Sequence, residues 1–354
     1  MQRSDPRVSR RLGVIALVAL MCTTLAALSA APVAGDEGPR LKVMSRNMYL
    51  GADLMAVASA TSMEELMVKA AAVHEMVQST DFPTRARALA REVDRTDPVL
   101  IGLQEVALWR KGPLDGPATQ AKEVVYDFLK ILRSRLAARG LHYEIVVRQA
   151  TFDLEVPTTL GFDLRLTQRN VILARSDLPP GQLRLSNPRR RHFDNNFVYR
   201  TTFGDIEDTR GWTSVDVVYK GRSFRFINTH LDSFVEPMRL LQAQELLERP
   251  ARVPGRKVLV GDLNDVPTSA TLAKLRNAGF RDAWARAGDG PGYTYGQDED
   301  LRNVRSKLYK RIDYVLAGKR IGVLDAQNVG GKRWERIAGL WPSDHAGVVA
   351  TLAP

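Results

Sequence analysis

Short apolar runs with β-branched character recur along the chain from residue 41 onward, and they constrain its fold more than any other feature. They lie at residues 41–44, 99–103, 143–147, 171–174, 224–227, 258–260, 314–316 and 348–350. Such runs are typical of β-strands. Ala- and Leu-rich segments with charges spaced for one solvated helix face lie between some of them, at residues 63–77, 85–93, 121–139, 237–248 and 270–278. Because strands and helices mix without strict alternation, the pattern predicts an α/β sandwich rather than a barrel.

The first 34 residues have the features of an export signal. Four Arg precede a mainly apolar stretch over residues 12–31, and small residues crowd its end. This order predicts a signal peptide cleaved at about residues 30–34 and a secreted or periplasmic protein. An uncleaved membrane anchor is the alternative, since about 20 apolar residues could span a bilayer. No repeat or linker divides the remainder, so we expect a single domain over residues 35–354.

Composition and charge exclude several classes of protein. The hydrophobic fraction of 44% and charged fraction of 26% argue against a disordered, fibrous or polytopic membrane protein. Cys22 is the only cysteine of the chain, which excludes a disulfide framework and any site built on several thiolates. The formal charge of +11 favours polyanionic partners such as nucleic acid, anionic lipid or phosphorylated small molecules. We expect a monomer without an obligate protein partner.

Polar side chains with catalytic potential border six of the predicted strands. They are Asn47, Glu105, His230, Asp262, Asn264, Asp313, Asp344 and His345. A rigid sheet can hold such groups at fixed separations, which is why functional residues gather at strand ends. Each residue alone could be a helix cap, a turn residue or a structural histidine. The ordered set as a whole favours a catalytic site.

This ordered set resembles the endonuclease/exonuclease/phosphatase superfamily, which includes deoxyribonucleases, apurinic endonucleases, sphingomyelinases and inositol-polyphosphate phosphatases. Three motifs carry the resemblance together: Gln-Glu at 104–105, Gly-Asp-Leu-Asn at 261–264 and Ser-Asp-His at 343–345. The resemblance extends over residues 41–352. It implies a four-layer α/β sandwich, in which two mixed β-sheets pack face to face with helices outside. It also implies an enzyme, a metal-dependent phosphoric ester hydrolase.

The resemblance assigns a metal and a catalytic dyad to particular residues. Asn47, Glu105 and Asp344 would hold Mg²⁺ or Mn²⁺, for which oxygen ligands are suited. His345 and Asp313 would form an imidazole–carboxylate dyad that activates water, with the carboxylate fixing the tautomer and stabilising the imidazolium.

The remaining candidates would act on the phosphate. Asp262 and Asn264 resemble the pair that handles the phosphate and the nucleophile or leaving group, and Asp262 is an acid/base candidate because the identity of the general base stays open. His230 would contact the phosphate and protonate the leaving group. The substrate-binding candidates are Glu155, Arg169 and Asn170, the first of which is also the expected carboxylate partner of His230.

Two basic clusters make nucleic acid the favoured substrate. Residues 165–200 contain eight Arg against two Asp, and residues 302–311 hold a second cluster. Both flank motif segments and could steer a polyanion, although a charge run is usually a solvated face. An anionic or choline phospholipid is an alternative, with Trp334 and Trp341 as conceivable membrane contacts, although core packing explains each Trp more simply. An inositol phosphate is another alternative substrate. The remote alternative is a protein without catalytic activity that keeps this fold and binds a polyanion or a partner.

Residues 52–77 depart from compact members of the superfamily. They form an Ala- and Met-rich helical insertion between Asn47 and Glu105. We expect this insertion to be extra packing, with a lid over the site as the alternative. The cysteine pairs of secreted deoxyribonucleases are also missing, so their bridged loops cannot be transferred.

Overall fold

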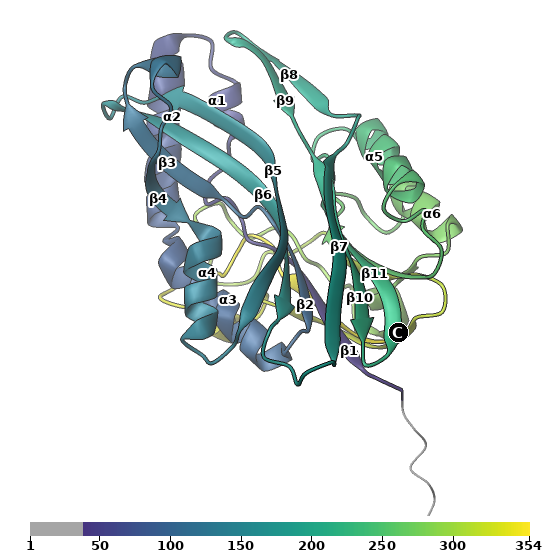
Figure 1. Cartoon of the computed structure of the whole chain (residues 1–354). Helices are drawn as coiled ribbons and strands as arrows, with labels where there is room; N and C mark the ends of the chain where they lie inside the picture. Colours follow the sequence, from purple (N-terminus) through teal and green to yellow (C-terminus); the bar gives the residue numbers. More distant parts are fainter. Residues whose placement is uncertain (1–37) are drawn as a thin grey trace, which may run out of the picture. The chain divides into compact units, whose positions relative to one another are not determined.

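Two mixed β-sheets face each other in the computed structural model, which describes residues 38–354 (Figure 1). The strands of the first sheet are β1 (Leu41–Asn47), β2 (Leu100–Gln104), β3 (Leu108–Pro113), β4 (Glu123–Asp127), β5 (Tyr143–Pro157), β6 (Phe162–Arg175), β15 (Gly322–Val329) and β16 (Gly347–Ala353). Their order is β15-β16-β1-β2-β6-β3-β4, and β5 pairs with β6. The predicted signal peptide lies outside the described residues. None of the helices in residues 38–354 has the length and apolar character that crossing a bilayer requires.

The second sheet runs in the order β13-β14-β12-β11-β10-β7. Its strands are β7 (Leu183–His192), β10 (Gly211–Tyr219), β11 (Arg222–His230), β12 (Arg256–Asp262), β13 (Arg281–Asp282) and β14 (Asp313–Ala317). A hairpin of β8 (Phe197–Thr201) and β9 (Gly204–Asp208) forms a two-stranded sheet of its own. The pairs β1–β2 and β11–β12 are parallel, so each sheet has two neighbouring central strands that end at the same edge.

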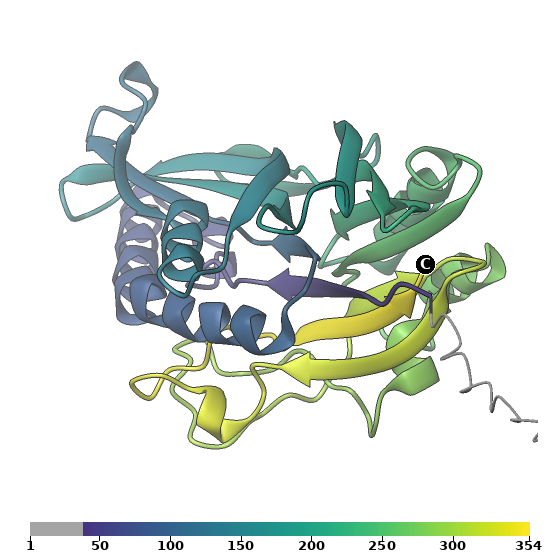
Figure 2. The ribbon, with the colours of Figure 1, turned by 60° about the horizontal axis from the view of Figure 1, so that its bottom comes forward.

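Helices cover the outer faces of both sheets (Figures 1 and 2). They are α1 (Met55–Ala58), α2 (Met63–Ser79), α3 (Phe82–Thr96), α4 (Phe128–Ala137), α5 (Glu236–Glu248), α6 (Ala270–Asn277) and α7 (Ala283–Ala287). Helices α2 to α4 share one apolar core with the first sheet, and α5 and α6 share another with the second. A third core, which includes Leu100, Phe226 and Val260, fills the space between the sheets. The predicted four-layer α/β sandwich is confirmed.

The helix predicted over residues 121–139 is only partly correct. Residues 123–127 instead form β4, where Val124 and Tyr126 pair with β3. The helix begins at Phe128, because the carboxylate of Asp127 accepts hydrogen bonds from the backbone N–H groups of Leu129 and Lys130. A carboxylate in this position satisfies N–H groups that lack partners in the helix. The sequence pattern did not reveal that residues 123–127 form a strand, because Val and Tyr also occur in helices.

The insertion at residues 52–77 packs into the core of the first sheet. It forms α1 and most of α2, and buries Val57, Leu66, Ala70, Val73 and Val77 in the apolar cluster under that sheet. Ser62 caps α2 by accepting a hydrogen bond from the N–H of Glu65. The expected extra packing is present, and part of the same insertion, including Met55 and Val57, also lines the cavity at the edge of the sandwich.

Gly102 lets the two sheets approach each other closely beneath the strand ends. A Cβ at this position would lie 2.4 Å from Cγ2 of Val260 and 2.7 Å from Oδ1 of Asn228, both on the opposite sheet. The amide of Asn228 crosses the gap and donates to the backbone oxygens of Leu103 and Val171, at 3.1 Å each. The same Asn228 oxygen accepts from Gln104 Nε2 at 2.6 Å. This polar bridge fixes the spacing of the two sheets next to the site.

We expect Gly102→Ala to lower the free energy of unfolding by about 1–3 kcal/mol, because an inserted methyl overpacks a filled core. Urea titration monitored by circular dichroism measures this change. Gly38→Ala is the matched control, since a Cβ there meets nothing within 4 Å. Equal stability of the two variants would contradict the close approach of the sheets at Gly102.

Candidate active site

The strand topology brings the predicted catalytic residues to one edge of the sandwich. Asn47 ends β1 and Glu105 follows β2, while His230 and Asp262 end β11 and β12. Asp313 begins β14, which is antiparallel to β12, so it lies directly opposite Asp262. Asp344 and His345 precede β16, which is antiparallel to β1 and therefore starts at the same edge.

Asn47 links the carboxylates of the two sheets. Its Nδ2 donates to Glu105 Oε1 and to Asp262 Oδ2, at 3.0 Å each. The other oxygen of Glu105 accepts from the N–H of Leu50 at 2.9 Å. Glu105 has a φ of +53°, which is unusual for a residue with a side chain. This strained backbone and the two hydrogen bonds from Asn47 and Leu50 fix the Glu105 carboxylate at the cavity wall.

His345 and Asp313 form the predicted dyad. His345 Nδ1 lies 2.8 Å from Asp313 Oδ2, and its Nε2 lies 3.8 Å from Asp262 Oδ2 and 3.9 Å from Asp344 Oδ1. Burial alone would lower the pKa of His345, but Asp313, Asp344 and Asp262 raise that pKa well above its ordinary value. The imidazole is therefore held as a cation between carboxylates, with Nε2 toward the cavity.

Two of these carboxylates hold protons unusually tightly. Burial and the charge of Asp313 raise the pKa of Asp262 to about 7, against the lowering effect of His345. Burial also raises the pKa of Asp344 to about 6, with His345 opposing and Glu105 adding to the increase. Asp262 thus titrates near neutral pH, where a general acid or base is most effective.

His230 has a different environment from the one that the sequence predicts. Arg210 Nη1 lies 3.0 Å from His230 Nε2, and because a guanidinium only donates, this nitrogen must accept. His230 Nδ1 lies 3.3 Å from Gln168 Nε2, and His230 Nε2 also lies 3.5 Å from Asp262 Oδ2. Burial, followed by the charges of Arg210 and His345, lowers the pKa of His230 well below its ordinary value. His230 is therefore neutral and carries no proton on Nε2 for a leaving group.

The structure does not bring Glu155 to His230. The Glu155 carboxylate accepts from the N–H of Ala121 at 2.8 Å and lies 3.8 Å from Arg165. Gln168 and Arg210 occupy the two nitrogens of His230 instead. The β5–β6 register explains this difference, because Glu155 pairs with Arg165 and lies farther out along the hairpin than Gln168 does.

Arg169 and Asn170 lie beneath the site. The Arg169 guanidinium donates to the backbone oxygens of Val106 and Ala107 and to Asp127, so it fixes the segment after Glu105. Asn170 donates to the backbone oxygen of Gly211 at 3.3 Å, and its own Oδ1 has no partner among the described residues. Asn264, in contrast, lines the cavity, with its N–H on Asp262 Oδ1 at 2.9 Å and a φ of +50°.

Three residues of the site were missed by sequence reasoning. Arg210 is buried, bonds Asp208 at 2.8 Å and Ser233 at 3.2 Å, and turns its guanidinium to the cavity. The ring of Tyr295 lies 4.9 Å from the ring of His345. Arg85 donates to the backbone oxygens of Met48, Tyr49 and Pro342, and so ties the segment after β1 to the segment before His345. None of the three belongs to a sequence motif, because their roles depend on contacts between distant parts of the chain.

The donor set fits a hard divalent cation. The carboxylates of Glu105, Asp262, Asp313 and Asp344 lie together at this edge, with Asp262 and Asp313 buried and the other two partly exposed. Burial is the main cause that raises the pKa of Asp262 and of Asp344. Asp313 Oδ1 has no hydrogen-bond partner within residues 38–354. A second candidate group is formed by Asp262, Asp313 and His345, whose ligand atoms lie within 4.8 Å of one another. It shares no residue with the expected ligands Asn47, Glu105 and Asp344, and it would need His345 in its neutral form. Oxygen-rich groups of this kind suit Mg²⁺ or Mn²⁺.

Comparison with known proteins decides the family. The model of the endonuclease/exonuclease/phosphatase family matches residues 76–345, most of the chain. The chain belongs to the endonuclease/exonuclease/phosphatase family. No curated protein matches it in sequence. The predicted membership is thereby confirmed, and with it the class of phosphoester hydrolases.

Solved structures of this family share the fold. A family protein of Bacteroides thetaiotaomicron is 16% identical with a TM-score of 0.56, over 89% of this chain and 98% of that chain. A mannosyl-6-phosphatase of the same organism is 16% identical with a TM-score of 0.55, over 88% and 99%. D. rerio TDP2 complexed with a single-strand DNA product is 16% identical with a TM-score of 0.53, over 88% and 98%. At these identities the likeness shows the common fold alone.

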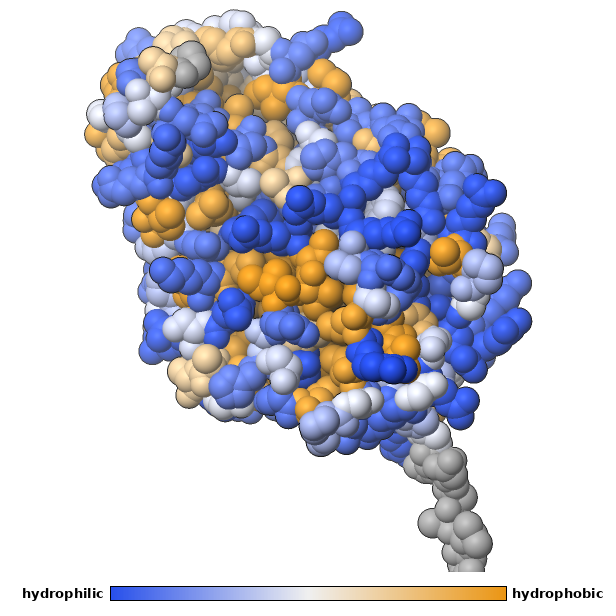
Figure 3. Space-filling model, viewed as in Figure 1, coloured by the Kyte–Doolittle hydropathy of each residue, from blue (hydrophilic) through white to orange (hydrophobic). Residues whose placement is uncertain are grey.

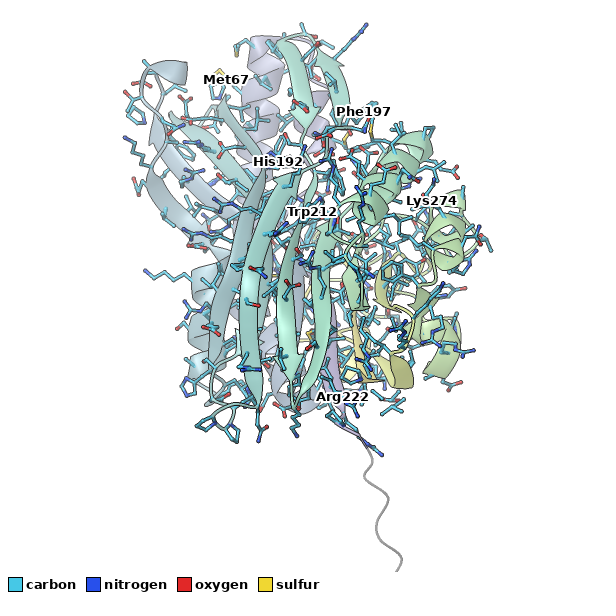
Figure 4. All side chains as sticks on the ribbon, turned by 45° about the vertical axis from the view of Figure 1, so that its right-hand side comes forward. Met67, His192, Phe197, Trp212, Arg222 and Lys274 are labelled. Carbon is cyan, nitrogen blue, oxygen red and sulfur yellow. The ribbon has the colours of Figure 1, made fainter. Side chains whose placement is uncertain are left out.

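A cavity of about 600 Å³ opens at the catalytic edge of this family member. Glu105, His230, Asp262, Asp344 and His345 line its floor. A volume of this size is typical of small-molecule and cofactor sites. The basic residues Arg189 to Arg191 do not belong to the described lining; they are exposed on β7, next to His192, whose Nε2 lies 2.7 Å from the backbone oxygen of Ala150 (Figure 4).

Proposed function

We propose that this protein is an exported, metal-dependent phosphodiesterase. The observation that carries the proposal is the His345–Asp313 dyad, placed within 4 Å of Asp262 and Asp344 at the floor of an open cavity. Export rests on the sequence of residues 1–34. Asn47, Glu105 and Asp344 would hold the metal ion, which when bound neutralises charge on the phosphoryl oxygens.

The residues of the chain divide the remaining work. Asp262, with a pKa of about 7, suits the removal of a proton from the attacking water at neutral pH. Asn264 lines the same cavity, and its Nδ2 donates to the backbone oxygen of Leu231 at 3.0 Å; in this proposal it also binds that water or a phosphoryl oxygen. His345, kept protonated by Asp313, donates through Nε2 to the phosphoryl group. The Arg210 guanidinium, oriented by Asp208 and His230, offers a second positive charge. This assigns water activation to Asp262 and charge stabilisation to the dyad.

Hydrolysis of bis(p-nitrophenyl) phosphate by the mature protein tests the proposal. We expect activity with Mg²⁺ or Mn²⁺, none in excess chelator, and recovery when the metal is added back. Slower hydrolysis of the monoester p-nitrophenyl phosphate would support a diesterase, whereas the reverse preference would favour a phosphatase. Undiminished turnover in excess chelator would refute metal dependence.

Nucleic acid as the substrate is a separate prediction that depends on Arg189, Arg190 and Arg191. If they contact a nucleic-acid backbone, replacing all three with Ser weakens DNA binding, and each lost contact flattens the plot of log affinity against log salt by about 0.7–0.9. Hydrolysis of bis(p-nitrophenyl) phosphate should change little, because these residues lie outside the cavity lining. A salt series on both substrates measures the two effects. If neither DNA binding nor hydrolysis of the small diester changed, the three arginines would be solvent-exposed residues without a role in substrate binding.

The two tryptophans give little support to a membrane contact at the last motif. Trp341 is fully buried, and its Nε1 donates to the backbone oxygen of Asn303 at 2.8 Å. Trp334 is 60% exposed, but Arg95 stacks on its ring at 4.5 Å. Core packing therefore accounts for Trp341, as the simpler interpretation of the sequence expected.

A further inference from the structure

The cavity continues from the catalytic floor into an apolar chamber. We define this chamber by side chains of three neighbouring elements: Val57 of α1, Val73 of α2, Leu154 and Val156 of β5, and Leu164 and Leu166 of β6. The catalytic residues and these aliphatic side chains line one and the same cavity of about 600 Å³. A group attached to a phosphate on the floor can therefore enter the chamber without leaving the cavity.

The alternation of β6 explains why the chamber joins the catalytic floor. Side chains two residues apart on a strand point to the same side. Gln168, Leu166 and Leu164 all line the cavity, and Gln168 contacts His230 at 3.3 Å. The face of β6 that supports the catalytic histidine thus becomes apolar over the next two positions toward the β5–β6 turn. On β5 the corresponding face carries Leu154 and Val156.

The β8–β9 hairpin closes the chamber on the side opposite β5 and β6. Figure 1 shows the β5–β6 and β8–β9 hairpins facing each other, both contribute lining residues to the cavity, and Figure 3 shows a partly apolar hollow between their upper parts. Tyr199 of β8 packs against Phe197 at 4.8 Å and Phe234 at 4.7 Å between ring centres, which anchors the hairpin at its base (Figure 4). The Tyr199 hydroxyl lies 3.8 Å from the sulfur of Met55 in α1, so β8 and α1 meet at the wall of the cavity.

The charges of the cavity favour one phosphate over many. Among the described lining residues, six are carboxylates, and only Arg210 and Lys310 are permanent cations. The carboxylates are Asp53, Glu105, Asp208, Asp262, Glu299 and Asp344. A metal ion and Arg210 can balance a single phosphodiester, but each further phosphate of a polyanion would face like charge. An uncharged apolar group meets no such penalty in the chamber.

We infer that the chamber binds an alkyl chain of the substrate, so that the enzyme cleaves amphiphilic phosphodiesters, as in lipids. This inference rests on the proposed phosphodiesterase function. The chamber is lined mainly by aliphatic side chains, which bury an alkyl chain without leaving polar groups unpaired. Each methylene transferred from water to such an environment strengthens binding roughly fourfold. Leu160 in the β5–β6 turn and Phe203 in the β8–β9 turn are 44% and 43% exposed, so apolar side chains also stand at both hairpin tips.

Chromogenic diesters of increasing chain length test the inference. The probes are methyl, butyl and octyl p-nitrophenyl phosphate, each assayed with Mg²⁺ below its micelle concentration. We expect kcat/KM to rise by roughly 100-fold or more from the methyl to the octyl ester, which is about half, in free energy, of the roughly 10⁴-fold gain for seven fully buried methylenes. A second assay presents the same octyl ester in phosphatidylcholine vesicles, to distinguish a substrate taken from a bilayer from a free amphiphile in solution. If the substrate comes from a bilayer, Leu160→Ser combined with Phe203→Ser should slow the vesicle reaction and leave the reaction in solution unchanged.

A pair of polar substitutions in the chamber identifies the binding site. Leu154→Asn with Val156→Thr should lower kcat/KM for the octyl ester at least fivefold, since polar groups in the chamber disfavour the chain, and should leave the methyl ester unchanged. Val124→Thr is the matched control, because Val124 is a 55% exposed strand residue of β4 outside the described lining.

Three results would overturn the inference. Equal kcat/KM for the three esters, with normal hydrolysis of the methyl ester, would leave the phosphodiesterase in place and remove the alkyl subsite. Faster cleavage of a single-stranded oligonucleotide than of the octyl ester would assign the cavity to nucleic acid. Hydrolysis of none of the esters in the presence of metal would refute the proposed function itself, and this inference with it.

Discussion

His345→Ala is expected to lower kcat on bis(p-nitrophenyl) phosphate by about 10²–10⁴-fold, the usual contribution of a group that transfers or donates a proton in the transition state. Asp313→Asn should be almost as damaging. An amide at this position cannot hold the Nδ1 proton by charge, so the imidazole loses the carboxylate that keeps its pKa high. Steady-state kinetics with the Mg²⁺-loaded protein measures both losses.

Other histidines of the chain provide the control. His192 is exposed on β7 with its Nε2 on a backbone oxygen, and His74 packs edge-on against Phe162 far from the dyad. Replacing either with Ala should leave kcat within about twofold. If His192→Ala abolished activity with an unchanged melting temperature, the site would have been placed wrongly. His230→Ala should also lower kcat, because Arg210 would lose the nitrogen that orients it.

The buried strands of this protein could be predicted from sequence, and the exposed ones could not. The apolar runs at residues 224–227 and 258–260 lie in β11 and β12, which are central in the second sheet and covered on both faces. In contrast, β7 ends in the exposed Arg189, Arg190 and Arg191 and has few apolar residues to mark it. A pattern of hydrophobicity reports burial, so a strand at a solvated edge gives a weak signal.

The catalytic residues at strand ends were predictable for a similar reason. Asp262 and His345 are next to buried strands whose direction fixes where they end, so a motif in the sequence defines a position in space. The partners of His230 were not predictable in this way. Whether Glu155 or Gln168 reaches it depends on the register of the β5–β6 hairpin, which includes two irregular steps. A single extra residue in one strand moves the following side chains to the other face.

Arg210 and the apolar chamber could not be predicted from sequence for a related reason. Both involve the β8–β9 hairpin, whose contact with α1 joins segments more than 140 residues apart in the chain. The sequence shows the catalytic chemistry because particular acids and imidazoles follow the predicted strands in a recognisable order. It does not show the substrate chemistry, because that chemistry depends on which aliphatic side chains of ordinary core type line a cavity.

The crowded carboxylates make metal-free protein sensitive to pH in a direction that can be worked out. The folded-state pKa of Asp262 is about 7 against an ordinary 3.8, so the folded chain holds this proton more tightly than the unfolded chain does. The pKa of His345 is also raised above 6.5. Both groups therefore favour folding at low pH, and this stabilisation is lost as pH rises through their folded-state values. The lowered pKa of His230 acts in the opposite sense, but only below about 6.5.

We therefore expect the free energy of unfolding in chelator to fall by about 1–2 kcal/mol between pH 6.5 and 8. Mg²⁺ at 100 times its dissociation constant should add about 2.7 kcal/mol and remove much of this dependence, because it balances the carboxylates. Thermal and urea unfolding at the two pH values, with and without Mg²⁺, measure both effects. The Glu105→Gln variant should gain no stability from Mg²⁺ and should lose most of its activity. Glu144→Gln, a change at an exposed position of β5, should keep both the stabilisation by Mg²⁺ and the activity. Stability that rises with pH in chelator, or no stabilisation of the wild-type protein by Mg²⁺ or Mn²⁺, would contradict a metal site built on these carboxylates.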